Sequence, residues 1–161
     1  MINRMFSIET PLGSFELEHD ENGIKSFWPA SISRKQIKPS NPTSKEIEQA
    51  LKDYFRGNFR KIENFSLNPS GTEFQKEVWR ILRSIPPGST LSYSEVAEKI
   101  GRPTAFRAVA RACATNPVAL FIPCHRVIAK NGSLSGFRGG LEMKKALLNL
   151  ERSIESLDAA C

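Results

Sequence analysis

The sequence predicts an α+β protein, with strands and one helix in residues 1–70 and mainly helices in residues 71–161. Residues 5–8 are typical of a strand, and residues 15–18 alternate apolar with polar side chains, the period of a half-buried strand. Farther along, apolar residues recur every three or four positions, the period of an amphipathic helix. A chain of 161 residues with 40% hydrophobic content is long enough to bury a core. We therefore expect two domains with a boundary between residues 70 and 71.

Residues 1–70 contain the signals of a β-hairpin followed by a helix. Asn22-Gly23 predicts a tight hairpin turn, because both positions tolerate a positive φ, and residues 24–28 would form the return strand. Residues 31–42 are polar and basic with two prolines, which predicts a loop. A helix is predicted over residues 44–57, where four apolar side chains recur at helical spacing: Ile47, Leu51, Tyr54 and Phe55.

Two amphipathic helices are predicted near the two ends of residues 71–161. The inner face of the first consists of Phe74, Val78, Leu82 and Ile85. Pro86-Pro87-Gly88 ends that helix. The inner face expected for the last helix consists of Leu141, Leu147, Leu148, Leu150, Ile154 and Leu157.

Two shorter helices between them are predicted to form a helix-turn-helix. Ser92 and Glu95 have capping-box spacing for the first of these helices. Gly101 suits the left-handed conformation that ends it, and Pro103 suits the first turn of a second helix over residues 105–114. We expect the second helix to face DNA, because this segment carries Arg102, Arg107 and Arg111. A small helical hairpin with a solvated basic face is the alternative on this pattern.

The positive charge of the sequence is concentrated in its second part. Residues 1–70 carry 10 Lys or Arg against 9 Asp or Glu, whereas residues 71–151 carry 12 against 6. Such a field favours an anionic partner, nucleic acid before others, although many basic surfaces are only solvated. No apolar run approaches the roughly 18 residues that cross a bilayer, and no signal-peptide pattern is present. We expect no membrane partner and a cytoplasmic location, or a nuclear one in a eukaryote.

The cysteine and histidine content predicts neither a disulfide framework nor a metal site. The three cysteines, Cys113, Cys124 and Cys161, are an odd number, so at least one thiol is expected to be free. Two histidines without any paired-cysteine spacing do not supply a tetrahedral zinc site.

Cys124 is the candidate nucleophile, because His125 follows it directly. A thiol attacks as the thiolate, so a reactive cysteine needs a neighbour that lowers its pKa or takes its proton. If Glu151 of the last helix holds the imidazole, the three residues form a nucleophile, a base and an orienting group. Taken singly, the three residue types are equally compatible with a buried structural cysteine, a histidine bonded to backbone and a solvated carboxylate.

The segment Pro123-Cys124-His125-Arg126-Val127 resembles the acceptor motif of the O6-alkylguanine-DNA alkyltransferases. The resemblance extends over residues 71–151 with matching spacing, through Gly71-Thr72-Glu73-Phe74-Gln75, Ile85-Pro86-Pro87-Gly88-Ser89-Thr90, Ser92-Tyr93, Arg107-Ala108-Val109, Asn116-Pro117, Gly139-Gly140-Leu141 and Leu150-Glu151. It implies an N-terminal domain with a ribonuclease-H-like α/β fold and a C-terminal, winged-helix-like helix-turn-helix domain that binds DNA and accepts the alkyl group.

The resemblance also implies the roles of the catalytic residues. Cys124 would accept the alkyl group of O6-alkylguanine irreversibly, once per molecule, as in a methylated-DNA–protein-cysteine S-methyltransferase. His125 would act as its base through a water, and Glu151 would orient the histidine. Asn116 would brace the turn between the recognition helix and the active-site segment. Because the alkyl group comes from DNA and ends as a thioether, we expect no cofactor and no metal.

The same resemblance implies residues that bind DNA or the flipped base. Arg107 matches an arginine finger that fills the space left by the flipped nucleotide, and Tyr93 matches a tyrosine that rotates the nucleotide and donates a hydrogen bond to the leaving guanine. The other residues expected to bind DNA or the substrate are Arg126, Val127, Ser135, Gly136, Phe137 and Arg138. The expected partner is double-stranded DNA that contains O6-alkylguanine, with O4-alkylthymine as a further candidate substrate, and the protein is expected to be a monomer.

Three rival functions are compatible with parts of this pattern. An alkyltransferase-like lesion binder flags damaged bases without repair, but its acceptor cysteine is replaced, whereas Cys124 is present here. A helix-turn-helix regulator has no need for a Cys-His pair beside a glycine-rich loop. A cysteine hydrolase would need an oxyanion-binding motif, and none is evident in the sequence.

Overall fold

The computed structural model describes residues 2–30, 35–134 and 136–160, with side chains described as far as residue 153. The chain divides into two compact units. The first comprises Met1–Ser70 with Pro117–Ala119, and the second comprises Gly71–Asn116 with Leu120–Cys161. This division lies at the predicted boundary, with one short segment added to the first unit, and the organisation into two domains stays a prediction.

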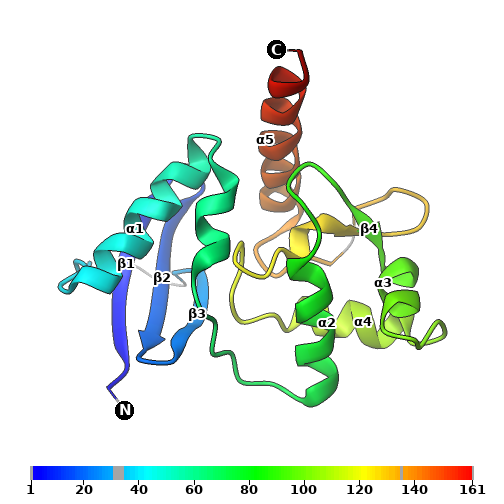
Figure 1. Ribbon diagram of the computed structural model, residues 1–161, viewed down its shortest axis with the longest axis horizontal. Coiled ribbons are helices and arrows are strands. Elements are labelled where there is room, and N and C mark those ends of the chain that lie inside the picture. The colour runs from blue at the N-terminus through cyan, green and yellow to red at the C-terminus, as the bar shows by residue number, and fades with distance from the viewer. Residues whose placement is uncertain (1, 31–34, 135, 161) are drawn as a thin grey trace. The chain divides into compact units, whose positions relative to one another are not determined.

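The first unit is built on a three-stranded antiparallel sheet in the order β1-β2-β3 (Figure 1). Its strands are β1 (Arg4–Thr10), β2 (Gly13–Asp20) and β3 (Gly23–Pro29). Phe15 and Leu17, two residues apart on β2, are buried on the same face, as their alternation predicts. The predicted hairpin between β2 and β3 is present, but its turn lies one residue earlier than predicted: Asp20 pairs with Gly23, so Glu21 and Asn22 form the turn and Gly23 begins β3 with a φ of +140°.

One helix packs against this sheet. Helix α1 (Pro42–Phe55) contacts β1, and a short 3-10 helix, η1 (Phe59–Asn64), follows it. The helix begins two residues before the predicted start, because Asn41 is its N-cap and accepts a hydrogen bond from the Ser44 amide. Of the loop predicted over residues 31–42, residues 31–34 lie outside the described residues.

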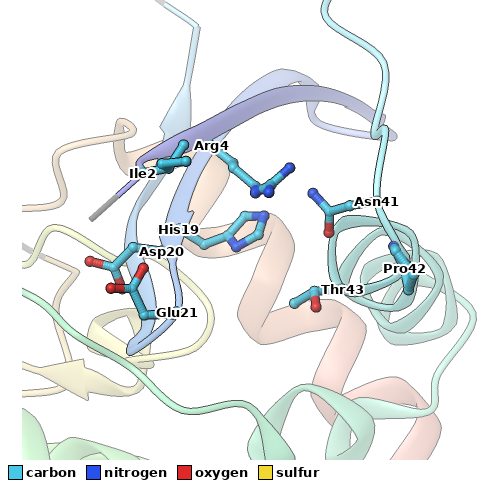
Figure 2. Close-up of a pocket in the computed structure, with 8 residues that line it drawn as sticks. All are labelled: Ile2, Arg4, His19, Asp20, Glu21, Asn41, Pro42 and Thr43. Atoms are coloured by element: carbon cyan, nitrogen blue, oxygen red, sulfur yellow. The ribbon is translucent and has the colours of Figure 1, made fainter.

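A pocket of about 630 Å³ opens in the first unit beside the N-terminus of α1 (Figure 2). It is lined by Ile2, Arg4, His19, Asp20, Glu21, Asn41, Pro42 and Thr43. His19 is buried, and its Nε2 lies 2.8 Å from the Ser44 hydroxyl, so this ring ties β2 to the helix. Because His19 is buried and bonded to Ser44, we assign the histidine a role in packing.

The second unit consists of four helices and a two-stranded parallel sheet. The helices are α2 (Glu73–Arg83), α3 (Tyr93–Lys99), α4 (Phe106–Ala114) and α5 (Leu141–Ala160). The strands are β4 (Leu91–Ser92) and β5 (Val127–Ile128), and a 3-10 helix, η2 (Cys124–Arg126), leads directly into β5. No helix of the described chain is long and apolar enough to cross a bilayer.

The connection between α3 and α4 follows the predicted pattern in part. The Ser92–Glu95 capping box is present, and Gly101 has a φ of +75°, as predicted for the residue that ends α3. The predicted range of the second helix, residues 105–114, agrees with α4 within one residue, but the placement of Pro103 in its first turn is wrong. Pro103 and Arg102 lie in the turn before α4, which begins at Phe106, and the Arg102 guanidinium lies 5.6 Å from the Phe74 ring centre. Of the three arginines expected on this helix, Arg107 and Arg111 are therefore the ones that it carries.

The inner face of α5 also differs from the prediction. Leu147 and Leu148 are buried, as predicted, but Leu141 is 50% exposed because it stands at the start of the helix. The predicted inward side chains of Ile154 and Leu157 lie outside the described ones.

Candidate active site

The acceptor motif lies in a tight turn that follows a short segment paired with β3. Val118 forms an isolated bridge with Phe27 of β3, and the backbones of Pro117 and Ala119 hydrogen-bond to Phe27 within the first unit. Leu120 then has a φ of +66°, which turns the backbone, and Cys124–Arg126 form η2. Because a 3-10 helix has three residues per turn, successive side chains project about 120° apart. Cys124 and His125 therefore point in different directions, and each has its own set of partners.

Glu151 of α5 joins two residues of η2 in a buried network. His125 Nε2 lies 2.8 Å from Glu151 Oε1. Arg126 donates from Nε to Glu151 Oε2 at 2.9 Å and from Nη2 to Oε1 at 2.7 Å. A third donor of Arg126, Nη1, bonds to the Ile85 carbonyl oxygen at 2.7 Å. The structure thus brings His125 and Glu151 together as predicted.

Burial and the neighbouring charges determine the protonation of this network. Burial by itself raises the pKa of Glu151, but the hydrogen bonds from His125 and Arg126 and the positive charge of Arg126 outweigh it and hold this pKa well below its ordinary value. Burial lowers the pKa of His125, and Glu151 opposes that effect only in part. At neutral pH the network therefore contains a carboxylate, a guanidinium and a neutral imidazole.

The neutral imidazole is oriented as a base. Since Nε2 faces a carboxylate oxygen, the proton of the ring lies on Nε2 and the lone pair on Nδ1. The buried Nδ1 has no hydrogen-bond partner among the described residues. The nitrogen that can accept a proton is thus the one that the network leaves available.

The Cys124 thiol is buried, with a relative exposure of 4%. Burial raises its pKa to about 11, while a hydrogen bond with the Asn116 side chain and the positive charge of Lys144 act in the opposite direction. The requirement for a lowered pKa is therefore not met in the DNA-free chain, because desolvation outweighs both neighbours. The thiol is protonated at neutral pH and needs a base.

Asn116 has the bracing position expected for it. Its side chain is fully buried and donates from Nδ2 to the Ile122 carbonyl oxygen at 2.8 Å. This hydrogen bond joins the residue just beyond α4 to the residue two positions before Cys124. Together with its bond to the thiol, it fixes the sulfur relative to α4.

Lys144 of α5 is a site residue that sequence reasoning missed. Its relative exposure is only 1%, and its Nζ donates to the Val127 carbonyl oxygen at 2.7 Å. The same Nζ lies 6.0 Å from the centre of the Tyr93 ring. Burial lowers the pKa of Lys144. The sequence spacing could have indicated this position. Lys144 precedes Glu151 by seven residues, which is two helical turns, so both side chains lie on the same face of α5.

The residues expected to bind DNA or the substrate lie in two different environments. Arg107 on α4 and Arg138 before α5 are exposed, and Tyr93 and Phe137 are half-buried. Gly136 is also exposed, whereas Ser135 lies outside the described residues.

Arg126 and Val127 are buried in the DNA-free chain, and their expected roles in binding DNA or the substrate stay predictions. The Arg126 guanidinium is engaged by Glu151 and by a backbone carbonyl, so its charge is used inside the protein. Val127 is fully buried in β5 and contributes its carbonyl to Lys144. Within the described residues, no cluster of three or more His, Cys, Asp or Glu side chains is arranged to hold a metal ion.

Comparison with known proteins identifies relatives along nearly the whole chain. The family model described as 6-O-methylguanine DNA methyltransferase, DNA binding domain, matches residues 73–153. A methylated-DNA–protein-cysteine methyltransferase of Methanosarcina acetivorans is 41% identical, covering 90% of this chain and 96% of its own. A constitutive methylated-DNA–protein-cysteine methyltransferase of Bacillus subtilis is 37% identical, covering 94% and 96%.

Solved structures match the fold of both units. The Mycobacterium tuberculosis O6-methylguanine methyltransferase has a TM-score of 0.82 at 34% identity, covering 94% of each chain. The OGT protein of the same organism, solved in complex with DNA, has a TM-score of 0.81 at 35% identity, covering 93% of each chain. Fold and site together define a DNA-binding protein whose reactive group is a cysteine. With matches of this extent, the chain belongs to the methylated-DNA–protein-cysteine methyltransferase family.

Proposed function

We propose that this protein repairs DNA by transferring the alkyl group of O6-alkylguanine to its own Cys124. The observation that carries the proposal is the buried Cys124 turn beside the His125–Glu151 pair, within residues that match the family's DNA-binding domain. In the reaction, a sulfur–carbon bond forms and the carbon–O6 bond of the damaged base breaks. Guanine leaves as an anion that must be protonated, and the thiol proton passes to the protein.

His125 is the base in this reaction. Its Nδ1 holds the lone pair, and we infer that a water carries the thiol proton to it, as expected for the family. Glu151 holds Nε2–H and stabilises the imidazolium that forms. The high resting pKa of Cys124 keeps the thiol protonated, so it reacts when a substrate and a proton acceptor are both in place.

Lys144 and Asn116 favour the thiolate once it forms. Both lower the pKa of Cys124, Lys144 through its charge and Asn116 through a hydrogen bond. Such fixed groups stabilise developing charge without reorganising, which is the usual source of electrostatic catalysis. Tyr93, whose ring lies near the Lys144 ammonium, is the group proposed to donate to the leaving guanine. The product thioether has no leaving group that water can displace, so each molecule reacts once.

DNA binding is assigned to α4 and to the loop before α5. We propose that α3 and α4 form a helix-turn-helix with α4 as the recognition helix, and that Arg107 enters the base stack when the nucleotide is flipped. Flipping is needed because the O6-alkyl carbon lies inside the stack, and it requires a few kcal/mol. Gly136, Phe137 and Arg138 would close over the extruded base.

The finer fold and the setting of the protein also remain proposals. A ribonuclease-H-like topology for residues 1–70 and a winged-helix-like topology for residues 71–161 are expected from the resemblance. A monomeric state and a cytoplasmic location, or a nuclear one in a eukaryote, are expected as well. Activity on O4-alkylthymine is a candidate extension of the same chemistry.

Mass spectrometry after mixing the protein with a duplex that contains one O6-methylguanine tests the proposal. We expect a single methyl group on the peptide that contains Cys124, saturating at one per protein. Cys124→Ser should abolish transfer and leave duplex affinity nearly unchanged, whereas Cys113→Ser, the matched control at another buried free thiol, should still transfer. An unmodified protein that still prefers the lesion duplex would favour the lesion-binding alternative.

A further inference from the structure

Phe106 is an exposed aromatic side chain at the first residue of α4. Its relative exposure is 42%, although a phenyl ring is a side chain that folding normally buries. The helix packs on the protein through Val109, Ala112 and Cys113, which are all buried. Phe106 shares a helical face with Val109 and Cys113, three and seven residues later, but it stands at the first residue of the helix, where the core leaves much of its ring exposed.

Positively charged and small side chains lie around the ring on α4. The Arg107 guanidinium carbon lies 5.9 Å from the centre of the Phe106 ring. On the exposed part of the same helix, Arg111 adds a second charge, and Ala108 and Ala114 have small side chains. Small side chains let a bulky partner approach the helix closely, and the two arginines select a polyanion. A flat apolar ring beside such charges matches nucleic acid, whose bases present π-faces behind a row of phosphates.

We propose that Phe106 is a second DNA-stacking residue, which packs on a base at the edge of the gap that Arg107 fills when the damaged nucleotide is flipped. The inference rests on the proposed function, because it assumes the flipped state. Apolar wedges and aromatic rings commonly insert at or stack on unstacked base steps, and each stacked base adds measurable affinity. The ring therefore stabilises the open duplex, whereas in a closed duplex no unstacked base is available for it to contact.

The contact between the two side chains gives the ring a further effect. A guanidinium above an aromatic face is attracted by the ring quadrupole, even at an exposed site. Phe106 thus restricts the rotamers of Arg107 before DNA arrives and reduces the entropy that is lost when the arginine enters the stack. Phe106 and Arg107 therefore act together to fill the gap left by the flipped nucleotide.

The test measures transfer and base unstacking separately for Phe106→Ala. With O6-methylguanine in a duplex, we expect single-turnover methyl transfer at saturating protein to slow about tenfold. The fluorescence of a 2-aminopurine placed next to the lesion should rise less on binding than it does with the wild-type protein. Phe106→Trp, which keeps an aromatic face, should retain at least half of both signals.

Three controls separate stacking from other effects. A single-stranded oligonucleotide with O6-methylguanine needs no duplex opening, so its transfer rate should fall less than about threefold. The affinity of Phe106→Ala for the undamaged duplex and its rate of Cys124 labelling by iodoacetamide should stay within about twofold of wild type. Its melting temperature should stay within about 2 °C. Ile37→Ala, which truncates an apolar side chain that is 48% exposed in the first unit, should change none of these signals.

Each outcome bears on one proposal. Equal losses on single-stranded and duplex substrates, or an unchanged duplex rate and fluorescence, would overturn the stacking role. If the wild-type protein binds the lesion duplex but transfers no methyl group, the proposed function fails. The 2-aminopurine signal then still decides whether Phe106 stabilises the open duplex.

Discussion

Replacing Glu151 by Gln should destabilise the second unit strongly, because no orientation of the amide satisfies its neighbours. Glu151 Oε1 faces His125 Nε2 and Arg126 Nη2, and Oε2 faces Arg126 Nε, so both oxygens meet donors. A Gln side chain must direct its NH₂ group at one of these donors. It also leaves the Arg126 guanidinium, only 4% exposed, without its counter-charge.

The expected loss follows from that unpaired charge. Removing one partner of a buried ion pair lowers the free energy of unfolding by about 3–5 kcal/mol. In a chain of this size, a loss of about 4 kcal/mol lowers the melting temperature by roughly 8–16 °C. The Arg126→Met, Glu151→Gln double variant contains no unpaired charge and should be about 2 kcal/mol more stable than Glu151→Gln alone.

Urea unfolding followed by tryptophan fluorescence measures the effect. The chain has two tryptophans, and in a Trp28→Phe background the remaining Trp79, buried in α2, reports on the second unit. The matched control is Glu48→Gln, which removes an exposed i,i+4 pair with Lys52 and should cost less than about 0.5 kcal/mol. A loss below about 1 kcal/mol for Glu151→Gln, or strict additivity in the double variant, would refute the reasoning.

The pH dependence of stability provides a further check on the same carboxylate. Because the folded pKa of Glu151 is depressed, its contribution to stability is complete above the unfolded value near 4.5. The contribution decreases as the pH falls from there towards the folded pKa. The acid-induced loss of stability below that value should therefore be smaller in Glu151→Gln than in the wild-type protein.

Three other predictions concern the thiol and its neighbours. The first uses DNA-free protein in which the other two cysteines are replaced by serine. Because the pKa of the Cys124 thiol is about 11, the rate of its labelling by iodoacetamide should rise about tenfold per pH unit between pH 7 and 10. A labelling rate that is already constant from pH 7 would contradict this pKa. Lys144→Met should slow methyl transfer about tenfold and move the pH profile of Cys124 labelling to higher pH, because the thiolate loses a neighbouring positive charge. Lys144→Arg should restore part of the transfer rate. An unchanged pH profile would exclude an effect of the Lys144 charge on the sulfur. Asn116→Ala should lower the free energy of unfolding by about 1–3 kcal/mol in urea titrations, because a buried carbonyl loses its donor, and full retention of stability would argue against bracing.

The elements that were predicted correctly depend on neighbours in the sequence. The hairpin between β2 and β3 and the Ser92–Glu95 capping box are local arrangements, so residue types and spacing suffice to predict them, the hairpin turn to within one residue. The same holds for the Gly101 end of α3. Pro103 was placed wrongly in the first turn of α4 because proline tolerates the turn before a helix as well as its first turn.

The segment that leads to the acceptor cysteine could not be predicted in this way. Residues 117–119 are held by hydrogen bonds and an isolated bridge to Phe27 of β3, which lies about ninety residues earlier in the chain. The positive φ of Leu120 and the 3-10 turn at Cys124 have no local sequence signal, since leucine rarely adopts that conformation. Long-range pairing and burial decided this geometry.

By itself, the sequence determined which chemical groups the protein has and which family they match. The order and spacing of Cys124, His125 and Glu151 are covalent facts, and the capping and turn residues determine local structure. Only the tertiary structure decided the state of those groups. Packing of α5 against η2 buries the site, so Cys124 is protonated at rest and Arg126 binds Glu151. Lys144 enters the site for the same reason, since a pKa and an ion pair depend on which charges folding brings within a few ångströms.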